Sequence, residues 1–261
     1  MIETIVLVLF TVILCLLAPL YQAARKRMTN FKDANLERFN FKKFFEVGVL
    51  KLFFTIIISL YFLFILSRTL SPATPTWASI SGFAVYILCI LIAFWAEGIY
   101  FTSIVFDRYF ELLKVKKKDL NFLSLKKIEH LLHGVLSHSL ESNAYMLAIM
   151  GIFIIETFTP KTEILSVFSL IIFILIGIIW GVMYMAFYIV GDIFIYGYIS
   201  SIAQLIISLG LLKISNPNFT ENSFSIFYIF FISTFVVLGT IHLIYLKSNK
   251  RQIHWNREKY M

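Results

Sequence analysis

Glu97 is a lone carboxylate inside a long apolar run, in the stretch WAEGIY. It stands before Asp107 by about ten residues, which on a helix of 1.5 Å per residue is roughly 15 Å from the polar end of the run. On that helix Tyr86, Ala93, Glu97 and Tyr100 share one face, which predicts that Glu97 points into a bundle. Ionisable groups are costly inside a membrane, so Glu97 is either a proton or cation site or a protonated carboxyl bonded to a neighbouring helix.

A second pattern lies in the run 193–212 and the turn before it. Asp192, Tyr196, Ser200, Gln204 and Ser208 recur every four residues, which places them on one slowly drifting face of a helix. Such a stripe can line a polar path or a substrate pocket. It can equally serve hydrogen bonding between helices, which membrane bundles use freely. We carry these five residues and Glu97 as candidates for a substrate path.

Three of the five histidines lie in the polar stretch 107–143. His130, His133 and Glu141 fall on one face of a helix with His138 beside them, and two histidines one turn apart with a carboxylate can hold a transition metal ion. His242, near the end of the last apolar run, adds a possible partner for a metal or haem. The interleaved Lys and Leu residues equally indicate an amphipathic helix on a membrane surface, and we favour that interpretation, expecting no bound cofactor.

Three further residues suit packing or anchoring better than chemistry. Gly177 and Gly181 form a GxxxG pattern, which lets two helices approach closely in a membrane. Glu156 stands near the end of its apolar run, close enough to the lipid headgroups to serve as an anchor. We therefore expect structural roles for all three.

The elements that must position these residues are membrane-spanning helices. The chain has 261 residues, of which 59% are hydrophobic and 28 are Phe, which is outside the range of soluble domains. Apolar runs of about 20 residues match the bilayer core. The two cysteines, Cys15 and Cys89, both lie inside apolar runs, which argues against a disulfide framework or a cysteine zinc site.

The sequence predicts an all-α polytopic membrane protein of about seven spans, forming a single helical domain over residues 1–261. The candidate spans are 2–22, 47–67, 78–104, 139–158, 164–190, 193–212 and 224–246. The fourth is weak because it begins with charged residues and has a short apolar part, and the sixth because only Gly191 and Asp192 separate it from the fifth. Without these two the chain has five spans and the same termini. Seven Lys and Arg residues lie between 25 and 46, seven between 107 and 138, and five after Leu246, against three on the other side. By the positive-inside rule the N-terminus is outside, the C-terminus is inside, and 107–138 forms a basic amphipathic inner segment.

Three classes of function fit these features. The first is a transport or channel-type protein, or the membrane subunit of one, with a polar path lined by Glu97 and the stripe from Asp192 to Ser208. The second is a signalling, immunity or assembly protein whose basic inner surface docks a partner protein. The third is an intramembrane metal or haem enzyme that uses the central histidines. In each case we expect a plasma (inner) membrane location and contact with the bilayer and its anionic lipids, but not with nucleic acid.

Overall fold

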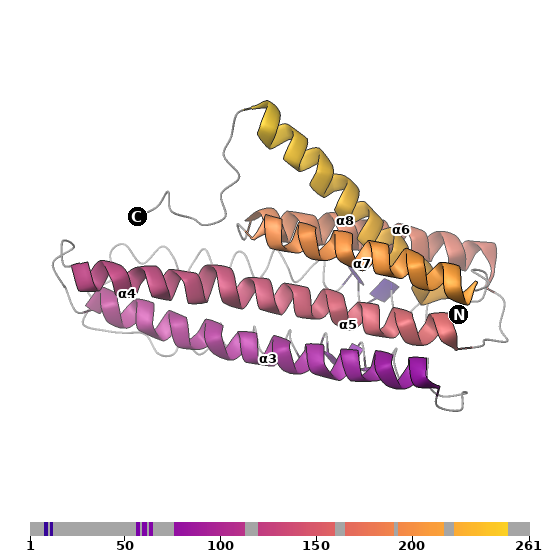
Figure 1. Ribbon diagram of the computed structural model, residues 1–261, viewed down its shortest axis with the longest axis horizontal. Coiled ribbons are helices and arrows are strands. Elements are labelled where there is room, and N and C mark those ends of the chain that lie inside the picture. The colour runs from indigo at the N-terminus through magenta and orange to yellow at the C-terminus, as the bar shows by residue number, and fades with distance from the viewer. Residues whose placement is uncertain are drawn as a thin grey trace.

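The computed structural model describes residues 76–112, 120–159, 165–190, 193–216 and 222–249, with short stretches at 8–9, 11–12, 56–57, 59–61 and 63–64. The described segments are helices with short connections, and none of them is a strand. The long helices are α3 (Trp77–Leu112), α4 (Leu120–His130), the π-helix η2 (Leu131–Ser137), α5 (His138–Phe158), α6 (Val167–Val190), α7 (Phe194–Ser215) and α8 (Ser223–Ser248) (Figure 1). The prediction of an all-helical protein is confirmed for this part of the chain.

Five helical stretches are long and apolar enough to cross a membrane. They are Trp77–Ser103, Leu123–Phe158, Val167–Ile189, Phe194–Ser215 and Ser223–Ser248, and they include the two spans that are weakest in the sequence. The predicted spans 2–22 and 47–67 fall mostly outside the described residues. The count of seven and the orientation of the termini therefore stay predictions.

Side-chain caps define where two of the helices begin. Thr76 and Ser79 bond reciprocally at the start of α3: the Ser79 N–H donates to the Thr76 hydroxyl over 3.1 Å, and the Thr76 N–H donates to the Ser79 hydroxyl over 2.8 Å. Ser166 accepts from the N–H of Ser169 over 3.1 Å in the first turn of α6. These bonds satisfy backbone donors that a helix start leaves without an intrahelical partner.

The described helices pack in two groups joined by α5 (Figure 1). Helix α3 runs along the rod formed by α4, η2 and α5, and α6 runs along α8, while α5 also contacts α7 and α8. Helices α3 and α7 do not contact each other. Glu97 and the stripe on α7 consequently lie on helices that α5 separates.

Glycines set the closest approaches in both groups. A Cβ on Gly82 of α3 would lie 2.7 Å from the carbonyl oxygen of Gly151 in α5, and a Cβ on Gly151 would lie 2.7 Å from the carbonyl oxygen of Gly82. In the other group, Cβ atoms on Gly177 and Gly181 would lie 2.5 Å and 2.8 Å from backbone oxygens of α8. The expected packing role of the GxxxG pattern is thus what the structure shows, because only a glycine fits at either position without displacing backbone.

Helix α3 and the continuous run of α4, η2 and α5 extend well past the length that a bilayer requires. With 36 residues α3 is about 54 Å long, whereas a bilayer with its headgroups is about 40–45 Å thick. The described parts of 107–138 continue these two helices as neighbouring rods (Figure 1). Contact of this segment with the inner membrane surface stays a prediction.

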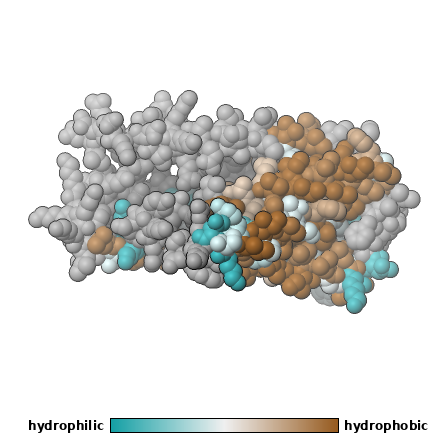
Figure 2. All heavy atoms as spheres, turned by 90° about the horizontal axis from the view of Figure 1, so that it is seen from above, coloured by the Kyte–Doolittle hydropathy of each residue, from teal (hydrophilic) through white to brown (hydrophobic). Residues whose placement is uncertain are grey.

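On the face that Figure 2 shows, the described part of the surface is largely hydrophobic, which suits contact with lipid. Large apolar side chains are exposed along α6, α7 and α8, including Ile171, Leu175, Ile206, Ile207 and Val237. The described helices therefore have the length and the apolar surface that fit an integral membrane protein.

Candidate functional site

Glu97 lies on the buried face of α3, as its spacing predicts. Only 2% of its surface is exposed, and Tyr86, Ala93 and Tyr100 on the same face are buried as well. The carboxyl group therefore sits inside the protein rather than against lipid. Its surroundings are defined by the helices that pack on this face of α3, chiefly η2 and α5.

The π-helix η2 determines which side chains meet Tyr100. In an α-helix His133 and His138 would point about 140° apart, since they are five residues apart at 3.6 residues per turn. A π-helix bonds residues five apart and so places them on adjacent turns of one face. The Ser137 hydroxyl donates to the carbonyl oxygen of His133 within this segment. The two imidazole rings consequently stand edge to face with centroids 5.7 Å apart.

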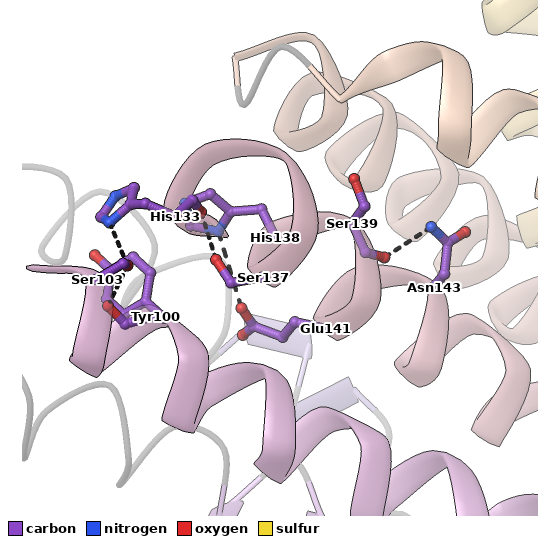
Figure 3. A network of polar contacts seen from close by, with 8 residues as sticks. All are labelled: Tyr100, Ser103, His133, Ser137, His138, Ser139, Glu141 and Asn143. Atoms are coloured by element: carbon purple, nitrogen blue, oxygen red, sulfur yellow. Dashed lines mark hydrogen bonds and ion pairs between the residues drawn. The ribbon is translucent and has the colours of Figure 1, made fainter. Parts of the chain in front are cut away.

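His133 is held by contacts from two helices (Figure 3). Its Nδ1 lies 3.1 Å from the Ser103 hydroxyl of α3 and 3.9 Å from a carboxyl oxygen of Glu129 in α4. Its ring lies against Tyr100, with centroids 4.7 Å apart. The imidazole is therefore fixed in orientation while about a quarter of its side chain stays exposed.

His138 faces the same tyrosine from the first turn of α5. Its ring centroid is 5.3 Å from that of Tyr100, and its Nδ1 lies 4.0 Å from a carboxyl oxygen of Glu141 (Figure 3). The ring of Phe187 in α6 stands edge to face with that of His138, with centroids 6.4 Å apart. We call the resulting group the histidine cluster; it consists of Tyr100, Ser103, Glu129, His133, His138 and Glu141.

Glu97 lies at the edge of the histidine cluster. Helices α3 and α5 are antiparallel, with Gly82 beside Gly151 and Ser103 beside His133. Since Glu97 is one turn before Tyr100 on the same face, this register places it level with the first turn of α5, where His138 and Glu141 stand. Two imidazoles and three carboxyl groups are thus arranged along one stretch of the α3–α5 contact.

The cluster is not arranged like a metal centre. Among the described residues, no three His, Cys, Asp or Glu side chains gather as ligands of one ion. The two Nδ1 atoms are directed at separate partners, and the side chain of His130 is outside the described residues. His242 packs against Phe194, with centroids 4.9 Å apart, on a helix that does not contact η2. The structure therefore does not bring His242 together with His133.

The stripe on α7 forms a second polar region on the other side of α5. Gln204 donates through Nε2 to the Ser200 hydroxyl over 3.0 Å and accepts from the Tyr228 hydroxyl of α8 over 3.2 Å. Ser208 is fully buried beside the same tyrosine, and Tyr196 is half-buried one turn before Ser200. Asp192, the first member of the predicted stripe, lies outside the described residues.

Glu156 has a structural task that its position in the sequence does not disclose. Its carboxylate accepts the backbone N–H groups of Phe224 and Ser225 over 3.2 Å and 2.5 Å, at the start of α8. Asn222, the residue before α8, makes no side-chain cap bond. A buried carboxylate from α5 thus caps α8, where the helix dipole favours a negative charge.

No family model, no curated protein and no solved structure matches this chain. A function for this chain is therefore inferred from the arrangement of its own residues.

Proposed function

We propose that the protein is a transport or channel-type integral membrane protein, or the membrane subunit of one, and that Glu97 is its ion-handling residue. The observation that carries the proposal is a nearly fully buried carboxyl group in an apolar helix, level with the histidine cluster. A charge at this depth costs several kcal/mol unless it is protonated or paired. Residues of this kind in membrane helices typically mark ion pathways or proton relays.

The proposed route follows the α3–α5 contact from the α4 end of the bundle. The partly exposed His133 lies at the end of the polar region nearer α4, and the buried Glu97 lies at its apolar end. Beyond Glu97 the same contact tightens to the glycine pair Gly82 and Gly151. Passage beyond Glu97 consequently requires a movement of α3 against α5.

The α7 stripe enters the proposal as a second polar surface. Its side chains are engaged with α8 through Gln204 and Tyr228. A shift of α7 against α8 that exchanges this bond for water or solute would expose Ser200, Gln204 and Ser208 together. We include Tyr196 and Asp192 because their spacing continues the same face. The membrane proposed for this activity is the plasma (inner) membrane.

The test is Glu97→Gln in purified protein reconstituted into liposomes. The amide has the shape of the carboxyl group but cannot titrate. Efflux of K⁺, Na⁺ and protons, followed with ion-selective electrodes and a pH dye, should fall at least about tenfold while folding stays intact. The matched control is Ile206→Leu, a lipid-facing change in α7 that should leave every flux unchanged.

The outcome that contradicts the proposal is equally specific. If Glu97 serves only as a structural hydrogen-bonding group, Glu97→Gln retains full flux. Glu97→Leu then lowers the free energy of unfolding by about 1–3 kcal/mol, because its partner group is left buried and unbonded.

A second candidate function, docking of a partner protein or anionic lipid, is favoured by the surface of α4. Lys126 and Lys127 are exposed there beside the exposed apolar side chains of Leu125 and Ile128. Basic and apolar side chains together suit an anionic lipid surface, at about 1 kcal/mol per cation. In this case Lys126→Gln with Lys127→Gln lowers binding of the protein in detergent to vesicles rich in phosphatidylserine and leaves ion flux unchanged.

A further inference from the structure

We propose that the transported species is the proton, taken up by His133 and passed by way of His138 to Glu97. This inference rests on the proposed transport function and names its substrate. It is carried by the position of two imidazoles where the π-helix η2 joins α5, each beside a carboxyl group and both against Tyr100.

The groups at the level of the two histidines come from five elements. Tyr100 and Ser103 of α3, Glu129 of α4 and Glu141 of α5 contact His133 of η2 or His138 of α5, and the register of α3 against α5 places Glu97 at the same level. From α6, Tyr184 and Tyr188 lie within electrostatic reach of Glu141. Lys126 and Lys127 of α4 are exposed and belong to the outside of the bundle. The described charges around the imidazoles are therefore carboxyl groups, which stabilise an added proton.

The hydrogen bonds of Ser103 determine the tautomer of His133. The Ser103 hydroxyl donates to the carbonyl oxygen of Tyr100 over 2.8 Å. With its hydrogen committed there, the Ser103 oxygen accepts from His133, so Nδ1 of the neutral imidazole carries the hydrogen. The lone pair of the neutral ring is thus on Nε2. An incoming proton forms a new N–H bond at that atom.

The chemistry of imidazole suits a proton better than a metal ion here. Its ordinary pKa of about 6.5 lets it take up and release a proton near neutral pH. Metal binding instead needs several lone pairs aimed at one point, whereas Nδ1 of His133 and Nδ1 of His138 are directed at Ser103 and Glu141. A proton needs only a series of single sites.

The transfer conserves atoms and electrons without a co-reactant. The proton bound at Nε2 of His133 leaves that nitrogen as an N–H bond forms on His138, whose imidazolium pairs with Glu141 at 4.0 Å. It then leaves His138 as an O–H bond forms on the Glu97 carboxylate. With centroids 5.7 Å apart the two rings are closer than two positive charges in an apolar site tolerate, so occupation of one site favours release from the other. The proton therefore moves on instead of being stored.

The experiment uses the full-length protein in liposomes loaded with a pH-sensitive dye, with a K⁺ diffusion potential set by valinomycin. Wild-type protein should acidify or alkalise the lumen according to the sign of the potential. His133→Asn and His138→Asn place an amide where Nδ1 stood, so they retain the contacts to Ser103 and Glu141 but cannot take up a proton. Each should lower proton flux at least about tenfold, in line with the loss of a proton-transfer group.

His242→Gln is the matched control, because this histidine packs on Phe194 away from the cluster and should leave flux unchanged. Imidazole ¹⁵N spectra of the full-length protein in detergent give a second readout that does not depend on transport. They should show His133 as the Nδ1–H tautomer and a titration of His133 that shifts in His138→Asn.

The possible results separate the two proposals. Flux of K⁺ or Na⁺ without any pH change, or proton flux that both Asn variants retain, overturns the proton relay and leaves transport standing. The absence of flux for all three ions overturns transport and the relay with it. An Nε2–H tautomer for His133, or two histidines that titrate independently, also overturns the relay whatever the flux.

Discussion

The contact of α6 with α8 and the contact of α3 with η2 and α5 solve the same packing problem with different side chains. In the first, glycines at 177 and 181 bring backbones together, and the rings of Trp180, Phe227 and Phe231 fill the spaces around them. In the second, Gly82 and Gly151 do the same at one end, but the other end is filled by the histidine cluster. The first contact combines apolar and aromatic side chains with Thr234 beside Gly181, whereas the second changes from apolar to ionisable side chains.

Packing alone explains the side chains found between α6 and α8, but not those found between α3, η2 and α5. Helices in a bilayer gain little from burying apolar surface against each other, so close contact and hydrogen bonds hold them together. Glycines and aromatic rings meet that need between α6 and α8 without any charge. Packing alone therefore does not account for the carboxyl and imidazole groups where α3 meets η2 and α5, and this difference supports the proposal that they have a function.

Substitutions of Glu156 test whether a buried carboxylate in this protein can have a purely structural role. Glu156→Leu removes the acceptor for the N–H groups of Phe224 and Ser225 at the start of α8. Two unbonded buried donors should lower the free energy of unfolding by about 2–6 kcal/mol, measured by denaturation in mixed micelles. Glu156→Gln, which retains one acceptor, should lower it by about half as much and leave ion flux intact. A loss of ion flux in a stable Glu156→Gln variant would mean that Glu156, like Glu97, takes part in ion transport and is not purely structural.

The positions of the described spans could be predicted closely from the sequence. The predicted span 78–104 corresponds to the helical stretch Trp77–Ser103, and 224–246 corresponds to Ser223–Ser248, whereas 139–158 is the second half of the longer stretch Leu123–Phe158. Such agreement follows because the bilayer fixes the length of an apolar run and leaves the backbone only the helix as an internally bonded form. Burial of Glu97 followed from the same regularity, since a period of 3.6 residues identifies the face it shares with Tyr86.

The histidine cluster could be predicted only in part. An α-helical period groups His133 with Glu141 and sets His138 aside, whereas the π-helix brings His138 onto the face of His133. Glu129, four residues before His133, has the spacing of a helical pair and was detectable. Ser103 was not, because its partner lies on another helix and a periodic pattern carries no information on which helices meet. For the same reason the sequence could not predict that Tyr228 bonds to Gln204 or that Glu156 caps the N-terminus of α8.

The glycine contact between α6 and α8 should respond less strongly than the Glu156 cap. Gly177→Ala places a Cβ 2.5 Å from the backbone oxygen of Phe227, so α8 must shift, at a cost of about 1–3 kcal/mol in the free energy of unfolding. Gly210→Ala is the matched control, because a Cβ there meets nothing within 4 Å. Its gain in helix propensity should leave stability unchanged or raise it slightly. Equal effects of the two substitutions would mean that α6 and α8 are not in close contact.

The smallest expected effect on stability concerns Gln204. It decides whether the α7 stripe serves packing, like the contact of α6 with α8, or transport, as we propose for the contact of α3 with η2 and α5. Hydrogen bonds between membrane helices contribute about 0.6 kcal/mol on average, because the unfolded chain in the membrane also finds partners. Gln204→Leu and Tyr228→Phe should therefore each lower the free energy of unfolding by about 1 kcal/mol or less, and a double-mutant cycle should give a coupling of that size. If the stripe only joins α7 to α8, ion flux in liposomes is unchanged in both variants. If it lines a route, as we propose, Gln204→Leu lowers flux by far more than so small a loss of stability explains, while Tyr228→Phe, which leaves the Gln204 amide in place, retains most of it.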